Sequence, residues 1–105
     1  MSSEKRIVLT GFMGVGKSTV AKCLSYILQC EKLDLDKVIE ETERRPVPEI
    51  IEQEGESRFR AIETENLRRI LAETEARVIA LGGGSWIIEK NRELIKAHNC
   101  TTVWL

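Results

Sequence analysis

The sequence predicts an α/β fold in which helices cover both faces of a parallel sheet. Short apolar segments alternate along the chain with longer segments whose apolar residues recur at helical spacing. A glycine-rich loop joins the first short segment to the first long one. The length of 105 residues and the hydrophobic content of 42% suit one small domain, residues 1–105, with a single core.

The first strand, residues 6–10, leads into a loop with a recognisable chemistry. Residues 11–18 read G-F-M-G-V-G-K-S and fit the pattern G-x-x-x-x-G-K-[ST], and a helix is expected over residues 18–29. Glycines let successive main-chain N–H groups curl around an anion, and the start of the following helix favours phosphate. Lys17 adds a full charge, and the Ser18 hydroxyl is suited to bind Mg²⁺. The loop therefore predicts binding of a nucleoside triphosphate.

The remaining elements follow from the same patterns and from their boundary residues. We expect a short strand at 31–34, helices at 36–43, 48–54 and 56–73, a strand at 77–81, a helix at 89–98 and a strand at 101–105. Pro46 and Pro48 end the first of these helices and start the second, and Gly55 ends the second. The helix at 56–73 is amphipathic, with its apolar residues mostly on one side.

Composition argues against several classes of protein. Lys and Arg total 16 against 17 for Asp and Glu, so the net charge of −1 gives no general attraction for nucleic acid or an anionic membrane. We find no secretory signal and no run of 18 apolar residues, and we expect a cytoplasmic protein. The three cysteines lack the C-x-x-C spacing of a zinc site and are odd in number, which argues against a disulfide framework.

Asp34 and Asp36 form a second candidate group. If residues 32–36 are extended, both carboxylates point to one side at the carboxyl end of a strand, where open α/β sheets bind ligands. One carboxylate could anchor the hydration shell of Mg²⁺ and the other could accept a proton from a hydroxyl. In the alternative, Asp34 ends the strand and Asp36 caps the next helix.

Arg60 and Glu63 form a third group, because residues three apart on a helix are neighbours. The carboxylate can hold the guanidinium and leave its other donors available for a planar anion. Arg58 points elsewhere, since two residues along a helix correspond to about 200° of rotation. A solvated helix rich in ion pairs would explain the same residues.

The glycines Gly82, Gly83 and Gly84 follow the apolar strand 77–81 and form the fourth group. Without side chains, a hydroxylated molecule could lie directly against the peptide groups at the end of that strand. An ordinary flexible turn is the alternative.

The order of these four groups along the chain resembles the shikimate kinase family, which transfers the γ-phosphoryl group of ATP to the 3-hydroxyl of shikimate. The resemblance rests on G-F-M-G-V-G-K-S, then D-L-D, F-R-A-I-E and G-G-G after an apolar strand, and it covers essentially the whole chain. It implies a P-loop NTPase-type three-layer α/β/α fold with strand order 2-3-1-4. It also implies the cofactors ATP and Mg²⁺ and shikimate as the small-molecule partner.

The resemblance assigns roles to individual residues. The residues that would bind the phosphates of ATP are Gly14, Val15, Gly16, Lys17, Ser18 and Thr19. Lys17 and Asp36 would be catalytic, with Asp36 accepting or orienting the substrate hydroxyl. Ser18 would bind Mg²⁺, and Asp34 would do so through water. The substrate would be bound by Asp36, Arg60, Gly82, Gly83 and Gly84, with Glu63 in support.

Shikimate kinases extend beyond the position of Leu105 with a fifth strand, a lid and two further arginines. We therefore expect this chain to be a fragment with little kinase activity by itself, since phosphate-binding arginines and lids contribute strongly to phosphoryl transfer. Residues 101–105 would then form an exposed edge that could associate with itself or with a partner. A non-catalytic nucleotide-binding module and another P-loop small-molecule kinase remain alternatives.

Overall fold

A computed structural model of the chain describes residues 6–11, 17–28, 32–74 and 76–105. The elements are β1 (Ile7–Thr10), α1 (Lys17–Leu28), β2 (Lys32–Asp34), α2 (Leu35–Glu43), α3 (Val47–Glu54), α4 (Glu56–Glu73), β3 (Val78–Ala80), the short 3₁₀ helix η1 (Ser85–Ile87), α5 (Glu89–Ala97) and β4 (Thr101–Trp104). One or more helices separate each strand from the next, as the sequence predicts.

The strands form one sheet with the order β2-β3-β1-β4, and every neighbouring pair is parallel. In register, Leu9 of β1 lies opposite Ala80 of β3 and Val103 of β4, and Asp34 of β2 lies opposite Ala80 on the far side. The strand order expected from the resemblance is confirmed. All carboxyl ends share one edge of the sheet, so the segments that follow β1, β2 and β3 begin close together.

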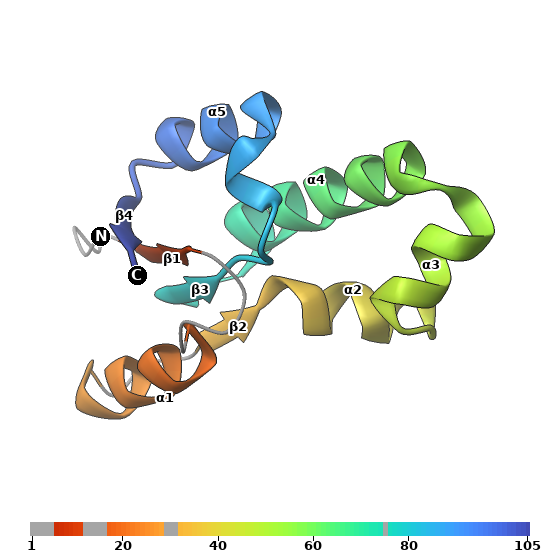
Figure 1. Ribbon diagram of the computed structural model, residues 1–105. Helices are drawn as coiled ribbons and strands as arrows, with labels where there is room; N and C mark the ends of the chain where they lie inside the picture. Colours follow the sequence, from red (N-terminus) through yellow and green to blue (C-terminus); the bar gives the residue numbers. More distant parts are fainter. Residues whose placement is uncertain (1–5, 12–16, 29–31, 75) are drawn as a thin grey trace.

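Helices cover both faces of the sheet, which gives the expected three layers (Figure 1). Alternate residues of one strand face opposite layers, so Val8 packs in one apolar cluster and Leu9 in the other. The larger cluster joins the sheet to α2, α4 and α5, and Leu67 and Ile79 are fully buried in it. The smaller cluster joins the other face to α1 through Ala21.

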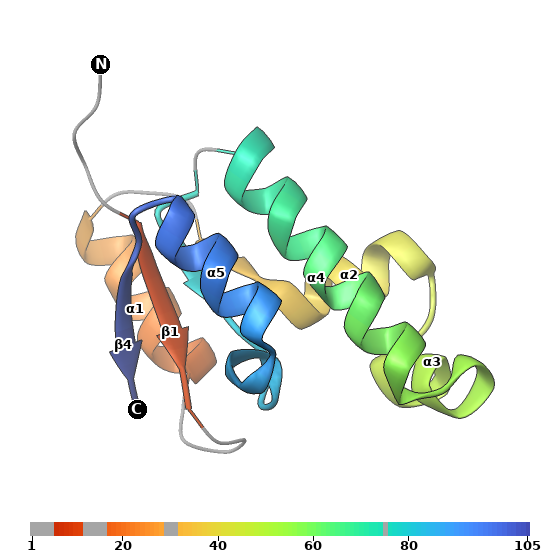
Figure 2. The ribbon, with the colours of Figure 1, turned by 90° about the horizontal axis from the view of Figure 1, so that it is seen from above.

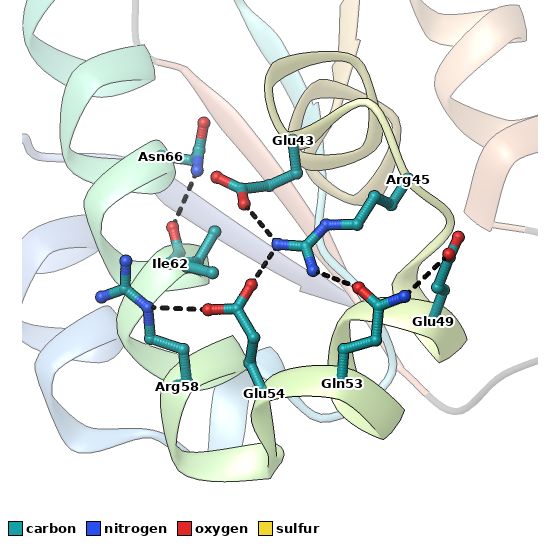
Figure 3. A network of polar contacts seen from close by, with 8 residues as sticks. All are labelled: Glu43, Arg45, Glu49, Gln53, Glu54, Arg58, Ile62 and Asn66. Carbon is teal, nitrogen blue, oxygen red and sulfur yellow. Dashed lines mark hydrogen bonds and ion pairs between the residues drawn. The ribbon is translucent and has the colours of Figure 1, made fainter.

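Helices α2 and α3 and the first half of α4 project to one side of the sheet (Figure 2). A network of polar contacts links the ends of these helices (Figure 3). Arg45 follows α2 and pairs with Glu54 at the end of α3, with Glu43 at 3.0 Å and with the side-chain oxygen of Gln53 at 2.7 Å. One guanidinium therefore joins the ends of two helices.

The helix boundaries agree closely with the sequence-based expectations, with one correction that matters for the site. Residues 32–36 are not extended throughout, because α2 begins at Leu35. The Asp34 side chain accepts a hydrogen bond from the main-chain N–H of Lys37 at 3.3 Å and so caps the helix. The expectation of two carboxylates on one side of a strand was wrong, and so was the alternative that Asp36 is the cap.

Strand β4 pairs with β1 alone among the described residues, and its last residue, Trp104, and the following Leu105 are exposed. Whether this edge pairs with another chain stays a prediction. Within the described residues, none of the helices combines the length and the hydrophobicity that a membrane span needs.

Candidate active site

The phosphate-binding loop lies mostly outside the described residues. Gly14, Val15 and Gly16 fall there, as do the side chains of Lys17 and Ser18, whose main chain opens α1. Thr19 lies in the first turn of α1 and is exposed. Gly11, the first glycine of the loop, is buried and has φ +146°, a value that residues with a side chain rarely adopt. The assigned phosphate contacts stay predictions.

The predicted substrate-binding residues converge on one cavity of about 510 Å³. Its lining consists of Asp36, Val47, Ile51, Phe59, Arg60, Glu63, Gly82, Gly83 and Gly84. Asp36 comes from the first turn of α2, Arg60 and Glu63 from α4, and the glycines from the segment after β3. The sheet explains this convergence, because α2 and the glycine segment both start at its carboxyl edge.

Asp36 has an unusual electrostatic setting. The pKa of Asp36 is raised from 3.8 to about 6, mainly by partial burial and also by the negative charges of Asp34, Glu63 and Glu40, while the guanidinium of Arg60 opposes the shift. A carboxyl group with a pKa near 6 is ionised at neutral pH and accepts a proton more readily than an ordinary aspartate. This property suits a group that receives a hydrogen bond or a proton from a hydroxyl.

Asp34 stands apart from this cavity, as the cap of α2 at the carboxyl end of β2. Its carboxylate is a hard oxygen donor, the kind that Mg²⁺ prefers. In the described part of the chain, no three or more His, Cys, Asp or Glu residues are grouped so that they could hold a metal ion.

Arg60 pairs closely with Glu63 and more loosely with Glu56. Its Nη1 donates to both carboxylate oxygens of Glu63, at 2.9 and 3.2 Å. Its Nη2 lies 3.7 Å from the exposed carboxylate of Glu56, and the guanidinium carbon lies 5.3 Å from the centre of the Phe59 ring. The side chain is 26% exposed. The predicted pairing of Arg60 with Glu63 is confirmed, and Arg60 keeps donors that can reach a planar anion in the cavity.

Two of the three glycines lie so close to charged side chains that a Cβ would force those side chains to move. A Cβ on Gly82 would lie 2.6 Å from Oδ1 of Asp36, and a Cβ on Gly84 would overlap Nη2 of Arg60. Both approaches are closer than real Cβ contacts allow. The glycine segment is therefore more than an ordinary turn, because it makes room for the two charged side chains that face the cavity.

Sequence reasoning missed two kinds of residue here. Val47 and Ile51 of α3 give the cavity an apolar wall, together with Phe59. Ser85 and Asn91 contact Glu63 behind the cavity. A hydroxyl directly after three glycines is a weak signal for Ser85, whereas nothing in the sequence connects Asn91 to a glutamate 28 residues before it.

Known proteins resemble this chain over nearly its whole length. The family model described as shikimate kinase matches residues 13–105. The shikimate kinase of Geobacter sulfurreducens is 46% identical over 95 residues, and that of Sulfurihydrogenibium sp. is 44% identical over 101 residues. These alignments cover 90% and 96% of the chain.

Solved structures give the same result. The shikimate kinase of Acinetobacter baumannii in complex with shikimate superposes with a TM-score of 0.92 at 39% identity, over 98% of this chain and 56% of that one. The enzyme of Bacteroides thetaiotaomicron gives a TM-score of 0.89 at 38% identity, over 96% and 56%. The chain spans between half and three fifths of the length of the relatives it matches, 52% and 60% for the two curated enzymes. By sequence and by structure, the chain belongs to the shikimate kinase family.

Proposed function

We propose that the protein phosphorylates the 3-hydroxyl of shikimate with ATP, and that this chain carries the phosphate loop and most of the substrate pocket. The observation that carries the proposal is the convergence of Asp36, Arg60 and the glycine segment 82–84 on one cavity. Family membership supports ATP as the phosphoryl donor. The related structure that contains shikimate supports this substrate.

In this proposal each charged group of the cavity has one task. Arg60 binds the carboxylate of shikimate through the donors that Glu63 leaves available, since a planar fork matches a carboxylate better than a lysine does. Asp36 accepts or orients the hydroxyl that attacks. The main chain of Gly82, Gly83 and Gly84 lies against the ring, and the cavity's apolar wall contacts its carbon face.

The nucleotide would lie at the neighbouring loop. Gly14 to Thr19 would surround the phosphates, with Lys17 at the β- and γ-phosphates. Ser18 directly and Asp34 through water would hold Mg²⁺, which when bound neutralises charge on the transferring group. Phosphoryl transfer needs alignment and charge neutralisation more than covalent help. On the substrate side, the protein therefore needs only a pocket that holds the hydroxyl in line with the transferring phosphate.

The decisive test is the binding of shikimate to protein with and without the Arg60 fork. Arg60→Ala should weaken shikimate binding by about 1.5–3 kcal/mol in calorimetric titration, because a charge-assisted pair is lost. Binding of an ATP analogue should not change. Arg68→Ala is a matched control, since it removes an exposed arginine that pairs with Glu65 on the same helix and lies away from the cavity.

The same titrations separate the alternatives. A kinase for an uncharged or a nucleotide substrate would bind ATP and would not bind shikimate. A non-catalytic nucleotide-binding module would bind ATP and would release no ADP when shikimate is added. Equal losses of shikimate and nucleotide in Arg60→Ala would show a folding defect, and a Glu63→Gln variant would then test the same pair with a smaller change of shape.

A further inference from the structure

Glu63 is the best-enclosed charged group among the residues the structure describes. Its side chain is 1% exposed, although it borders the cavity. A buried carboxylate is costly unless donors surround it. The donors come from three elements: Arg60 on α4, Ser85 on η1 and Asn91 on α5.

The contacts divide the two carboxylate oxygens of Glu63 between these donors. The Ser85 hydroxyl donates to Oε2 at 2.6 Å, and the amide nitrogen of Asn91 lies 3.4 Å from Oε1. The Nη1 of Arg60 bridges both oxygens. With donors on both oxygens, rotation of the carboxylate would break at least one buried hydrogen bond, and that is unfavourable.

Asn91 is itself locked in one orientation. Its Nδ2 donates to the main-chain oxygen of Ser85 at 3.0 Å, and its Oδ1 accepts from the hydroxyl of Thr64 at 2.7 Å. The Ser85 oxygen and the Glu63 carboxylate only accept hydrogen bonds, so the amide nitrogen must face them. Both Asn91 and Ser85 are completely buried. The hydrogen bonds therefore form a chain from Thr64 through Asn91 and Glu63 to Arg60.

Building on the proposed function, we propose that Ser85 and Asn91 are positioning residues of the substrate-carboxylate site. They hold Glu63 in one orientation, Glu63 holds Nη1 of Arg60, and the remaining guanidinium donors are thereby aimed into the cavity. Neither residue lines the cavity itself. The affinity for a carboxylate ligand thus depends on the side chains of Ser85 and Asn91, which do not touch the ligand.

Ligand binding can distinguish a positioning role of Ser85 and Asn91 from a purely structural one. Ser85 and Asn91 also join η1 and α5 to α4, so their loss should lower stability in either case. Only if the two residues position Arg60 should their loss weaken the binding of a ligand with a carboxylate more than that of a ligand without one. Shikimate and its methyl ester form such a pair of probes, since the ester keeps the ring and the hydroxyls and lacks the charge.

The test compares Ser85→Ala and Asn91→Ala with the parent protein by calorimetric titration. We expect each variant to bind shikimate about five- to tenfold more weakly and the methyl ester within about twofold of the parent. In an Arg60→Ala background, Ser85→Ala should cause no further loss. Equal losses for both probes, or no loss for shikimate, would overturn the proposal.

Asn66→Ala is the matched control. Asn66 is a buried asparagine on α4 whose Nδ2 donates to the main-chain oxygen of Ile62 (Figure 3) and whose Oδ1 accepts from Arg69, so these hydrogen bonds do not involve Glu63. Its loss should lower the unfolding midpoint without changing the ratio of the two affinities. A changed ratio in this control would show that the ratio reports stability alone, which would also count against the proposal.

A second measurement needs no ligand. In side-chain NMR of arginine, a guanidinium fixed by Glu63 shows separate Nη1 and Nη2 signals because rotation about Nε–Cζ is slow. We expect separate signals for Arg60 in the parent and averaged signals in Ser85→Ala. If shikimate fails to bind the parent, the proposed function fails, while this spectrum still decides whether Ser85 positions Arg60. Unchanged Arg60 signals in the variant would overturn the inference.

Discussion

The carboxylate of Asp36 occupies the space that a side chain on Gly82 would need. A Cβ on Gly82 would lie 2.6 Å from Oδ1, 2.8 Å from Oδ2 and 3.0 Å from Cγ of Asp36. Asp36 belongs to the first turn of α2, whereas Gly82 follows β3, and β2 and β3 are neighbours in the sheet. The absence of a side chain on Gly82, after β3, thus leaves room for the carboxylate of Asp36, after β2.

Gly82→Ala should therefore displace Asp36 from its place in the cavity. We expect the rate of shikimate phosphorylation to fall about 100-fold, because a shift of about 1 Å in a catalytic group costs roughly that much. Nucleotide affinity, measured by titration with an ATP analogue, serves as the internal control and should stay unchanged. An unaltered rate of the proposed reaction would mean that Asp36 keeps its position without this close approach to Gly82.

Gly84→Ala should act on binding instead of on the chemical step. The new Cβ would overlap Nη2 of Arg60 and lie 3.1 Å from its Cζ, so the guanidinium must leave its present position in the cavity. We expect shikimate affinity to fall about tenfold, the usual worth of one charge-assisted hydrogen bond. The KM for shikimate should rise more than kcat falls. The opposite division between KM and kcat would contradict the role given to Arg60.

Asp36→Asn should stabilise the fold in a pH-dependent way. The pKa of Asp36 is about 6 in the folded protein against 3.8 as the ordinary value, so the unfolded chain releases its proton first as the pH rises. Ionisation of Asp36 therefore favours unfolding increasingly between these two values and by a constant amount above the higher one. Below pH 3.8 the group is protonated in both states and contributes nothing.

The gain in stability of Asp36→Asn over the parent should thus grow from about pH 4 to about pH 6 and then level off near 1–2 kcal/mol, a figure reduced for the partly exposed carboxylate. Urea unfolding across this pH range, without divalent cations, measures it. Glu52→Gln removes an exposed charge of the same sign from α3 and controls for net charge. A gain in stability that is independent of pH, or that shrinks as the pH rises, would show that the pKa of Asp36 is not raised in the folded protein.

Gly55→Ala should destabilise the fold although the new methyl group meets no atom within 4 Å. Gly55 separates α3 from α4 with φ +87° and ψ 162°, a region that only glycine adopts readily. We expect a loss of about 1–3 kcal/mol in the free energy of unfolding. The neighbouring Ser57→Ala, an exposed helical position, should change it by less than about 0.5 kcal/mol. A tolerated Gly55→Ala would show that the junction has another conformation available.

The sequence predicts most of this fold because its patterns are local. The amphipathic residues of 56–73 define α4 to the residue, and the elements alternate as a parallel sheet requires. The convergence of Asp36 and the glycine segment also followed, since both come directly after neighbouring strands whose ends share one edge, whereas the place of Arg60 at the substrate came from the family resemblance. The start of α2 was misjudged by one residue, because the capping hydrogen bond of Asp34 begins the helix where an extended chain was expected.

Other features depend on contacts that no local pattern records. Glu63 was recognised as a partner of Arg60 because the two lie on one helix. Its contacts with Ser85 and Asn91 depend on how η1 and α5 pack against α4, and such long-range packing has no signature in one sequence. The pKa of Asp36 is another case, since it arises from burial and from charges on separate elements.

The place of β1 inside the sheet has a consequence for synthesis on the ribosome. Ile7 pairs with Val78 on one side and with Thr101 on the other, so the strand made first acquires its neighbours last. Contacts of such high sequence separation form late. Nascent chains halted before residue 101 should leave β1 open to proteolysis, whereas chains released beyond it should protect β1. Early protection would mean that β1 is held by something other than its native neighbours.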